Sequence, residues 1–191
     1  MKEKITGIIL AGGKSRRMGT DKAFVMFNGK KFIEYSIALA REFCDQILIS
    51  ANDEKYLQFG HSVISDIIPN HGPIGGIYSC LENSRNNFNF VISCDTPFIS
   101  IELIRYILKN VENHQIVAPT TGEELYEPLC AFYHKNSIPI IRQFINANNN
   151  KIPDIFKAVD FKAITIDNSL SFWQPNLFAN INTVNEFNRY C

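Results

Sequence analysis

The chain has 191 residues, of which 46% are hydrophobic, and its 19 Lys and Arg balance 19 Asp and Glu. At about 150 residues per domain, this length predicts one domain whose core needs no disulfide or metal to fold. The zero net charge argues against a strongly basic nucleic-acid-binding protein, but it permits one local cationic cluster for a small anion.

We expect neither a membrane span nor a secretory signal in this sequence. Apolar stretches such as 7–13 fall far short of the ~20 residues that a membrane helix requires. The apolar run after Met1-Lys2-Glu3-Lys4 is too short for a signal, which needs about 7–15 apolar residues. We therefore expect a cytoplasmic protein that binds no membrane. The five scattered cysteines lack metal-site spacing, so we expect reduced packing residues.

The first half of the chain alternates short apolar strands with helices. Runs rich in Ile, Val and Phe predict strands at 5–10, 46–50, 62–65 and 88–93. Apolar spacing and capping residues predict helices at 32–43, 74–83 and 101–111. Such alternation is typical of parallel βαβ units with helices on both faces of the sheet. We therefore expect an α/β fold of three layers around a mainly parallel, twisted sheet.

The second half is less regular. It predicts strands at 116–119, 127–133 and 161–166, and helices at 138–146 and 183–190. Pro128 places the 127–133 strand at a sheet edge, or marks its start, because proline cannot donate to a β-ladder. No linker or change of composition divides the chain, so we expect a single domain over residues 1–191.

A glycine-rich, basic segment directly follows the first strand. Residues 10–22 read LAGGKSRRMGTDK, with three glycines among four basic side chains. Glycines let a backbone approach a ligand, consecutive N–H groups can surround an anion, and Arg and Lys suit phosphate oxygens. The Walker A pattern fails, because it needs glycine where Ile8 stands, and the dinucleotide fingerprint also fails. The segment predicts a polyphosphate site at the carboxyl end of the strand.

Three polar residues follow the other early strands. Asp95 comes after the 88–93 strand and could hold Mg²⁺ beside the glycine-rich segment, or simply begin a turn. Asp66 precedes the glycine-rich stretch 72–76 and could accept a hydrogen bond from ribose or guanine, although capping of a loop is the commoner role. Asn52 is a weaker candidate for the nucleoside, and capping of a helix explains it equally well.

The motifs together identify a family. Residues 10–22 resemble the signature L-A-G-G-x-S-x-R-M-G-x-D-K of nucleotidyltransferases with a Rossmann-like GT-A fold. Further matches are Asp66 before GPIGG at 72–76, CDTPF at 94–98, EPL at 127–129 and NINT at 180–183. In this order they resemble the MobA family of molybdenum cofactor guanylyltransferases over nearly the whole chain.

This resemblance implies a reaction and its residues. The terminal phosphate of molybdenum-molybdopterin would attack the α-phosphorus of GTP and release pyrophosphate, with no covalent enzyme intermediate. Asp95 would hold Mg²⁺, while Arg16 and Lys22 would neutralise the phosphates; the roles of Lys14 and Arg17 stay open. The nucleotide contacts would be Leu10, Ala11, Gly12, Gly13, Lys22, Asp66 and Asp95, within a nucleotide-binding half at 1–100.

The resemblance also implies an acceptor-binding half at 101–191. Asn180 and Asn182 would line the molybdopterin side, although Val184-Asn185 stands where the family usually has Pro-Glu or Pro-Asp. Trp173 and Phe172 could cover a planar ligand, but core or interface packing is the favoured interpretation. Transient contacts with cofactor-delivery proteins or molybdoenzymes are implied as well.

Two alternatives remain on the sequence alone. A related transferase would use CTP or another phosphorylated acceptor, although the Leu10-Ala11-Gly12-Gly13 form favours GTP. A catalytically silent nucleotide-binding or cofactor-chaperone module is the other alternative. The presence of Arg16, Lys22 and Asp95 together favours an enzyme.

Overall fold

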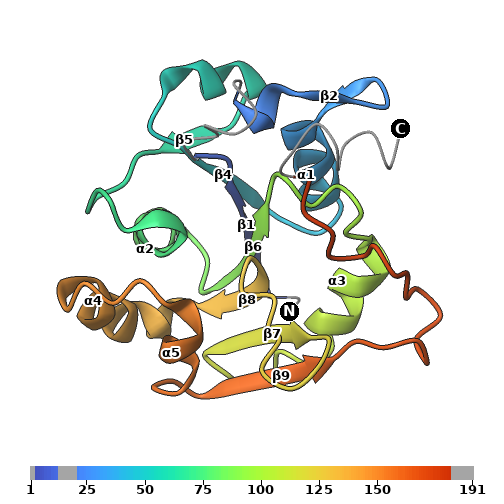
Figure 1. Cartoon of the computed structure of the whole chain (residues 1–191). Helices are drawn as coiled ribbons and strands as arrows, with labels where there is room; N and C mark the ends of the chain where they lie inside the picture. The colour runs from blue at the N-terminus through green and yellow to red at the C-terminus, as the bar shows by residue number, and fades with distance from the viewer. Residues whose placement is uncertain (1–2, 13–20, 182–191) are drawn as a thin grey trace.

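A computed structural model describes residues 3–12 and 21–181, and its centre is a seven-stranded sheet in the order β5-β4-β1-β6-β8-β7-β9 (Figure 1). The strands are β1 (Ile5–Leu10), β4 (Gln46–Ser50), β5 (Ser62–Ile64), β6 (Phe88–Ser93), β7 (Ile116–Thr120), β8 (Cys130–His134) and β9 (Phe161–Thr165). Strand β8 runs antiparallel to β6 and β7, and the remaining pairs are parallel. The predicted mainly parallel α/β sheet is confirmed.

Helices cover both faces of this sheet (Figure 1). Helices α1 (Phe32–Arg41) and α3 (Ile101–Leu108) lie on one face, and α2 (Gly72–Asn83), α4 (Ile138–Asn146) and α5 (Ile152–Phe156) lie on the other. The smaller elements are a hairpin of β2 (Met26–Phe27) and β3 (Lys30–Lys31) and the 3₁₀ turns η1 (Lys22–Phe24), η2 (Glu54–Phe59) and η3 (Lys135–Ser137). Within the described part of the chain, no helix is long and apolar enough to cross a membrane.

The alternation of side chains along each strand builds two cores. In β6, Phe90 and Ile92 belong to the core under α1 and α3, whereas Val91 belongs to the core under α2 and α4. In β1, Ile9 and Ile8 divide in the same way. A strand that is apolar on both sides is what a sheet covered on both faces requires.

Most of the predicted elements are confirmed. Of the two positions that Pro128 allowed for β8, a sheet edge is wrong. Strand β8 lies inside the sheet, and Pro128 precedes it by two residues, so the proline marks the approach to the strand and not a sheet edge. The β2–β3 hairpin was not predicted, although Asn28 and Gly29 have the positive φ angles (45° and 81°) of a tight hairpin turn. Helix α5 was also missed, and the predicted helix 183–190 lies outside the described residues.

The register of β1 aligns three strand ends at one edge of the sheet. Leu10 pairs with Ser50 of β4 on one side and with Ser93 of β6 on the other. The segments that contain Gly12, Asn52 and Asp95 therefore leave the sheet side by side. Ligands of open parallel sheets bind at this carboxyl edge.

Gly76 allows α2 to pack closely against β4 at this edge. A Cβ atom at position 76 would collide with the Oγ of Ser50. We expect Gly76→Ala to lower the free energy of unfolding by about 1 kcal/mol, as overpacked cores do. In a Ser50→Ala background the loss should shrink or reverse, because alanine favours a helix over glycine by about 0.5–1 kcal/mol.

Urea unfolding of the four proteins of this double-mutant cycle measures the coupling. An equal effect of Gly76→Ala in both backgrounds would show that Ser50 does not limit the approach of the helix.

Candidate active site

A cleft of about 690 Å³ opens at the carboxyl edge of β1, β4 and β6. Its size is within the usual range for a small-molecule site, about 300–1,000 Å³. It is lined by residues from the strand ends, from η2 and from the start of α2, among them Leu10, Gly12, Asp21, Ser50, Asn52, Asp53, Lys55, Tyr56, Asp66, Gly72, Gly76, Ser93 and Asp95. The cleft thus collects most of the described residues that the sequence singled out.

Lys22 and Asp95 meet in this region. The Nζ of Lys22 lies 3.1 Å from Oδ2 of Asp95, and each side chain is only 18% exposed. The Oγ of Ser93 donates to the other carboxylate oxygen, Oδ1, at 2.5 Å. The contact joins residues 73 positions apart, because η1 lies beside the end of β6. A carboxylate positioned at the cleft by a serine, with an ammonium opposite, is suited to a ligand that carries both phosphate and cation.

The start of the glycine-rich segment is bound to the sheet. The N–H groups of Ala11 and Gly12 both donate to the carbonyl oxygen of Ser50, at 3.1 and 2.9 Å. A Cβ at Gly12 would lie 3.3 Å from the Cα of Ala51, which is tighter than most Cβ contacts, so glycine favours this close approach of the two backbones. These two N–H groups extend the β1–β4 ladder and are not the open anion-binding donors that the sequence suggested.

Several predicted phosphate contacts fall outside the described residues. These are Gly13, Lys14, Arg16 and Arg17. Their predicted roles therefore stay predictions.

A buried tyrosine joins the two ends of the segment that begins at Ala11 and ends at Asp21. The hydroxyl of Tyr56 lies 2.7 Å from the carbonyl oxygen of Ala11 and 2.8 and 2.9 Å from the two carboxylate oxygens of Asp21. Burial, followed by the hydrogen bond to Asp21, raises the pKa of Tyr56, so the hydroxyl keeps its proton. The same group therefore holds the exit of β1 and the entry to η1.

Lys55 extends this network across the cleft wall. Its Nζ lies 2.8 Å from Asp21 and 3.1 Å from Asp53. Hydrogen bonds to Asp21 and then Asp53 raise the pKa of Lys55. No spacing rule links residues 35 positions apart, so the sequence did not predict Tyr56, Lys55 or the contacts of Asp21.

Asp66 and Asn52 form a reciprocal pair. The Nδ2 of Asn52 donates to Oδ2 of Asp66 at 2.9 Å, and the N–H of Asp66 donates to Oδ1 of Asn52 at 2.8 Å. The cap of η2 is Asp53, which accepts from the N–H of Lys55, so the helix-capping explanation of Asn52 is wrong. Both candidates for the nucleoside therefore lie together on one wall of the cleft.

The last described segment passes beside Asp95. The N–H of Ile181 donates to the carbonyl oxygen of Asp95 at 3.0 Å, and Ile181 is fully buried. The neighbouring Asn180 is exposed, and Asn182 lies outside the described residues. The described part of the predicted acceptor motif, 180–181, is thus bound to the backbone of the residue that was predicted to hold the metal.

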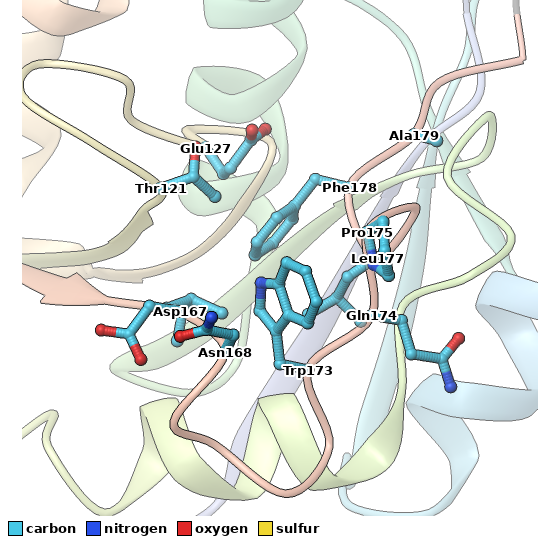
Figure 2. Close-up of a pocket in the computed structure, with 11 residues that line it drawn as sticks. Thr121, Glu127, Asp167, Asn168, Trp173, Gln174, Pro175, Leu177, Phe178 and Ala179 are labelled. Carbon is cyan, nitrogen blue, oxygen red and sulfur yellow. The ribbon is translucent and has the colours of Figure 1, made fainter.

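A second pocket, of about 530 Å³, lies beyond the ends of β7 and β9 (Figure 2). Trp173 lines this pocket and is 36% exposed, so the prediction that it packs in the core is wrong. Phe172 does pack on the core, and its ring centroid lies 5.6 Å from that of Tyr106. Glu127 also lines the pocket, and burial raises its pKa to about 7. Sequence reasoning treated Glu127 only as part of a motif.

We expect Tyr56→Phe to lower the free energy of unfolding by about 1–2 kcal/mol, because a buried carbonyl and a carboxylate lose a shared partner. Urea unfolding measures the effect. Tyr106→Phe is the matched control, since its hydroxyl makes no hydrogen bond with a described residue. Equal losses in the two variants would show that the contacts of the Tyr56 hydroxyl do not stabilise the fold.

The pKa of Glu127 predicts a pH-dependent stability. Because the pKa is higher in the folded chain than in the unfolded chain, folding takes up a proton, and the contribution of Glu127 falls as the pH rises through about 7. We expect Glu127→Gln to be more stable than the parent at about pH 8 and to lose this advantage towards about pH 5. Urea midpoints at both pH values, with the exposed Glu123→Gln as control, test this. An advantage that does not change with pH would contradict the burial of an ionising carboxyl.

Comparisons with known proteins assign the family. Residues 7–161 match the MobA-like NTP transferase domain. A protein of Clostridium perfringens (strain SM101) described as a "probable molybdenum cofactor guanylyltransferase" is 37% identical, over 96% of this chain and 94% of its own length. The molybdenum cofactor guanylyltransferase of Desulfosudis oleivorans is 31% identical, over 98% of this chain and 94% of its own length.

The structure also resembles a solved structure with a related description. A crystal structure of molybdopterin-guanine dinucleotide biosynthesis protein A from Archaeoglobus fulgidus superposes with a TM-score of 0.81 at 24% identity, covering 97% of this chain and 96% of that one. This likeness confirms the predicted nucleotidyltransferase fold. The chain therefore belongs to the MobA-like NTP transferase family and is a nucleotidyltransferase.

Proposed function

We propose that the chain transfers GMP from GTP to the terminal phosphate of molybdenum-molybdopterin and releases pyrophosphate. The names of its relatives support the substrates, and the contact between Lys22 and Asp95 at the cleft is the observation that carries the proposal. A nucleotidyltransferase needs positive charge for the phosphates and a hard oxygen ligand for a cation at one place. The two predicted residues supply both.

The proposal gives each part of the nucleotide a place in the cleft. The phosphates would lie near Lys22 and Arg16, beyond the ends of β1 and β6. Asp66, held by Asn52, would accept hydrogen bonds from the ribose or from the amino group of guanine. This wall comes from residues 1–100, whereas the acceptor would be bound by 101–191, where Ile181, the neighbour of Asn180, donates to the backbone of Asp95.

Asp95 fits a magnesium ion. Mg²⁺ is usually held by one or two carboxylates together with substrate phosphates and water, and Asp95 already attracts the ammonium of Lys22. Within 3–12 and 21–181 no group of three or more His, Cys, Asp or Glu could form a metal cage, which agrees with a site completed by the substrate. When bound, Mg²⁺ would neutralise phosphate charge and align the reacting groups.

The residues of the chain would then position the reactants. The acceptor phosphate is already an anionic nucleophile, so no serine or histidine has to be activated. Lys22 and Arg16 would offset the charge that develops on the pyrophosphate leaving group. Because Ser93 and Lys22 restrict the Asp95 side chain, the cation ligand would be preorganised.

Asp95→Asn tests the proposal directly. With GTP, Mg²⁺ and molybdenum-molybdopterin, we expect pyrophosphate release to fall about 100-fold or more, as when a transition-state charge loses its stabilising group. The control is Asp160→Asn, an exposed carboxylate before β9 at the opposite edge of the sheet, which should keep full turnover.

Undiminished release by Asp95→Asn would remove the metal assignment. Faster turnover with CTP than with GTP would assign a different base, and a trapped nucleotidylated residue would contradict direct transfer. Absence of turnover in the parent protein would favour a silent nucleotide-binding module.

A further inference from the structure

The pocket of Glu127 and Trp173 opens at the same edge of the sheet as the cleft. Strands β7 and β9 end at Thr120 and Thr165, and the antiparallel β8 begins there at Cys130. Two short segments run from the pocket to the cleft. Glu127 lines the pocket and Leu129 the cleft, while Ala179 lines the pocket and Ile181 bonds to Asp95. A ligand in the pocket would therefore lie next to the predicted reaction centre.

Glu127 brings a carboxyl group to the pocket that pairs with no described residue. Its backbone is fixed, because its N–H donates to the carbonyl oxygen of Pro119 at 2.9 Å and its own carbonyl accepts from Cys130 at 3.1 Å. The side-chain carboxyl makes no hydrogen bond or ion pair with any residue in the described part of the chain, and burial raises its pKa. A ligand with two adjacent N–H donors would pair both carboxylate oxygens.

The other walls suit a flat, polar ring. Figure 2 shows the rings of Trp173 and Phe178 among the side chains of Asp167, Asn168 and Gln174, all of which line the pocket. Exposed indole surface next to amides and carboxyls is suited to a heterocycle that both stacks and forms hydrogen bonds. Asp167 already accepts hydrogen bonds from the N–H and Oγ of Ser169, so Glu127 is the carboxyl of this pocket that is left for a ligand donor.

We propose that this pocket binds a fused aminopyrimidinone ring, with Glu127 accepting its exocyclic amino group and adjacent ring N–H and with Trp173 packing on its face. The inference rests on the proposed function, in which the acceptor carries such a ring as a pterin. Guanine presents the same donor pair, but the nucleotide is assigned to the cleft of Lys22 and Asp95. The pocket therefore belongs to the acceptor, and Glu127 determines its specificity.

The only tryptophan of the sequence, Trp173, makes the test direct. Titration of the full chain with 2-amino-4-oxopteridine should quench its fluorescence to saturation. Glu127→Gln keeps the shape of the side chain but replaces one acceptor oxygen by a donor, and should weaken binding roughly tenfold or more. Glu123→Gln, the same change in the same loop but outside the pocket, should bind like the parent.

A second ligand separates hydrogen bonding from stacking. The 2,4-dioxopteridine lacks the exocyclic amino group, so we expect the parent to bind it more weakly than 2-amino-4-oxopteridine and Glu127→Gln to lose most of this preference. Saturating GTP with Mg²⁺ should leave the pteridine bound.

Three results would overturn the proposal: no saturable quenching, equal affinities in the parent and Glu127→Gln, or displacement of the pteridine by GTP, which would assign the pocket to guanine. Circular dichroism of each variant verifies its fold. Failure of the pteridine titration in a protein that still transfers GMP would remove the pocket assignment alone. Binding of the pteridine by a protein that transfers no GMP would instead remove the proposed function.

Discussion

The site depends on the register of β1 between two parallel neighbours. Because Leu10 pairs with both Ser50 and Ser93, the chain leaves three strands at the same level and on the same edge. This pairing brings Gly12, the Asn52–Asp66 pair and Asp95 into one cleft. The ion pair of Lys22 with Asp95 joins residues 73 positions apart at the same edge of the sheet.

Close packing behind the cleft holds this edge in place. Gly12 lets the backbone after β1 touch the backbone after β4, and Gly76 lets α2 approach Ser50. Tyr56 then joins Ala11 to Asp21. These two glycines therefore serve close packing at this edge. The backbone amides of Ala11 and Gly12 donate to Ser50 and so stabilise the sheet.

Sequence reasoning was most successful where one strong local pattern decides the structure. Strands β1, β4 and β6 are buried on both faces, so each appears in the sequence as a continuous apolar run that predicts a strand. Asp95 was placed correctly at the cleft because it directly follows such a strand. Tyr56 was not predicted, because it meets Ala11 and Asp21 only in the folded chain. The short η2 turn also lacks the periodic apolar pattern that marks a helix or a strand. The interior position of β8 was missed because its proline lies before the ladder and removes no hydrogen bond from it. The Trp173 pocket needs the long segment after β9, which has no regular structure in the described residues.

A crystal structure of the chain with GTP and Mg²⁺ tests the central claim most directly. The account predicts that the triphosphate lies in the cleft at the ends of β1 and β6, with Lys22 turned to a phosphate oxygen and Asp95 next to the cation. A triphosphate bound elsewhere, or an Asp95 carboxylate that faces away from it, would contradict the account.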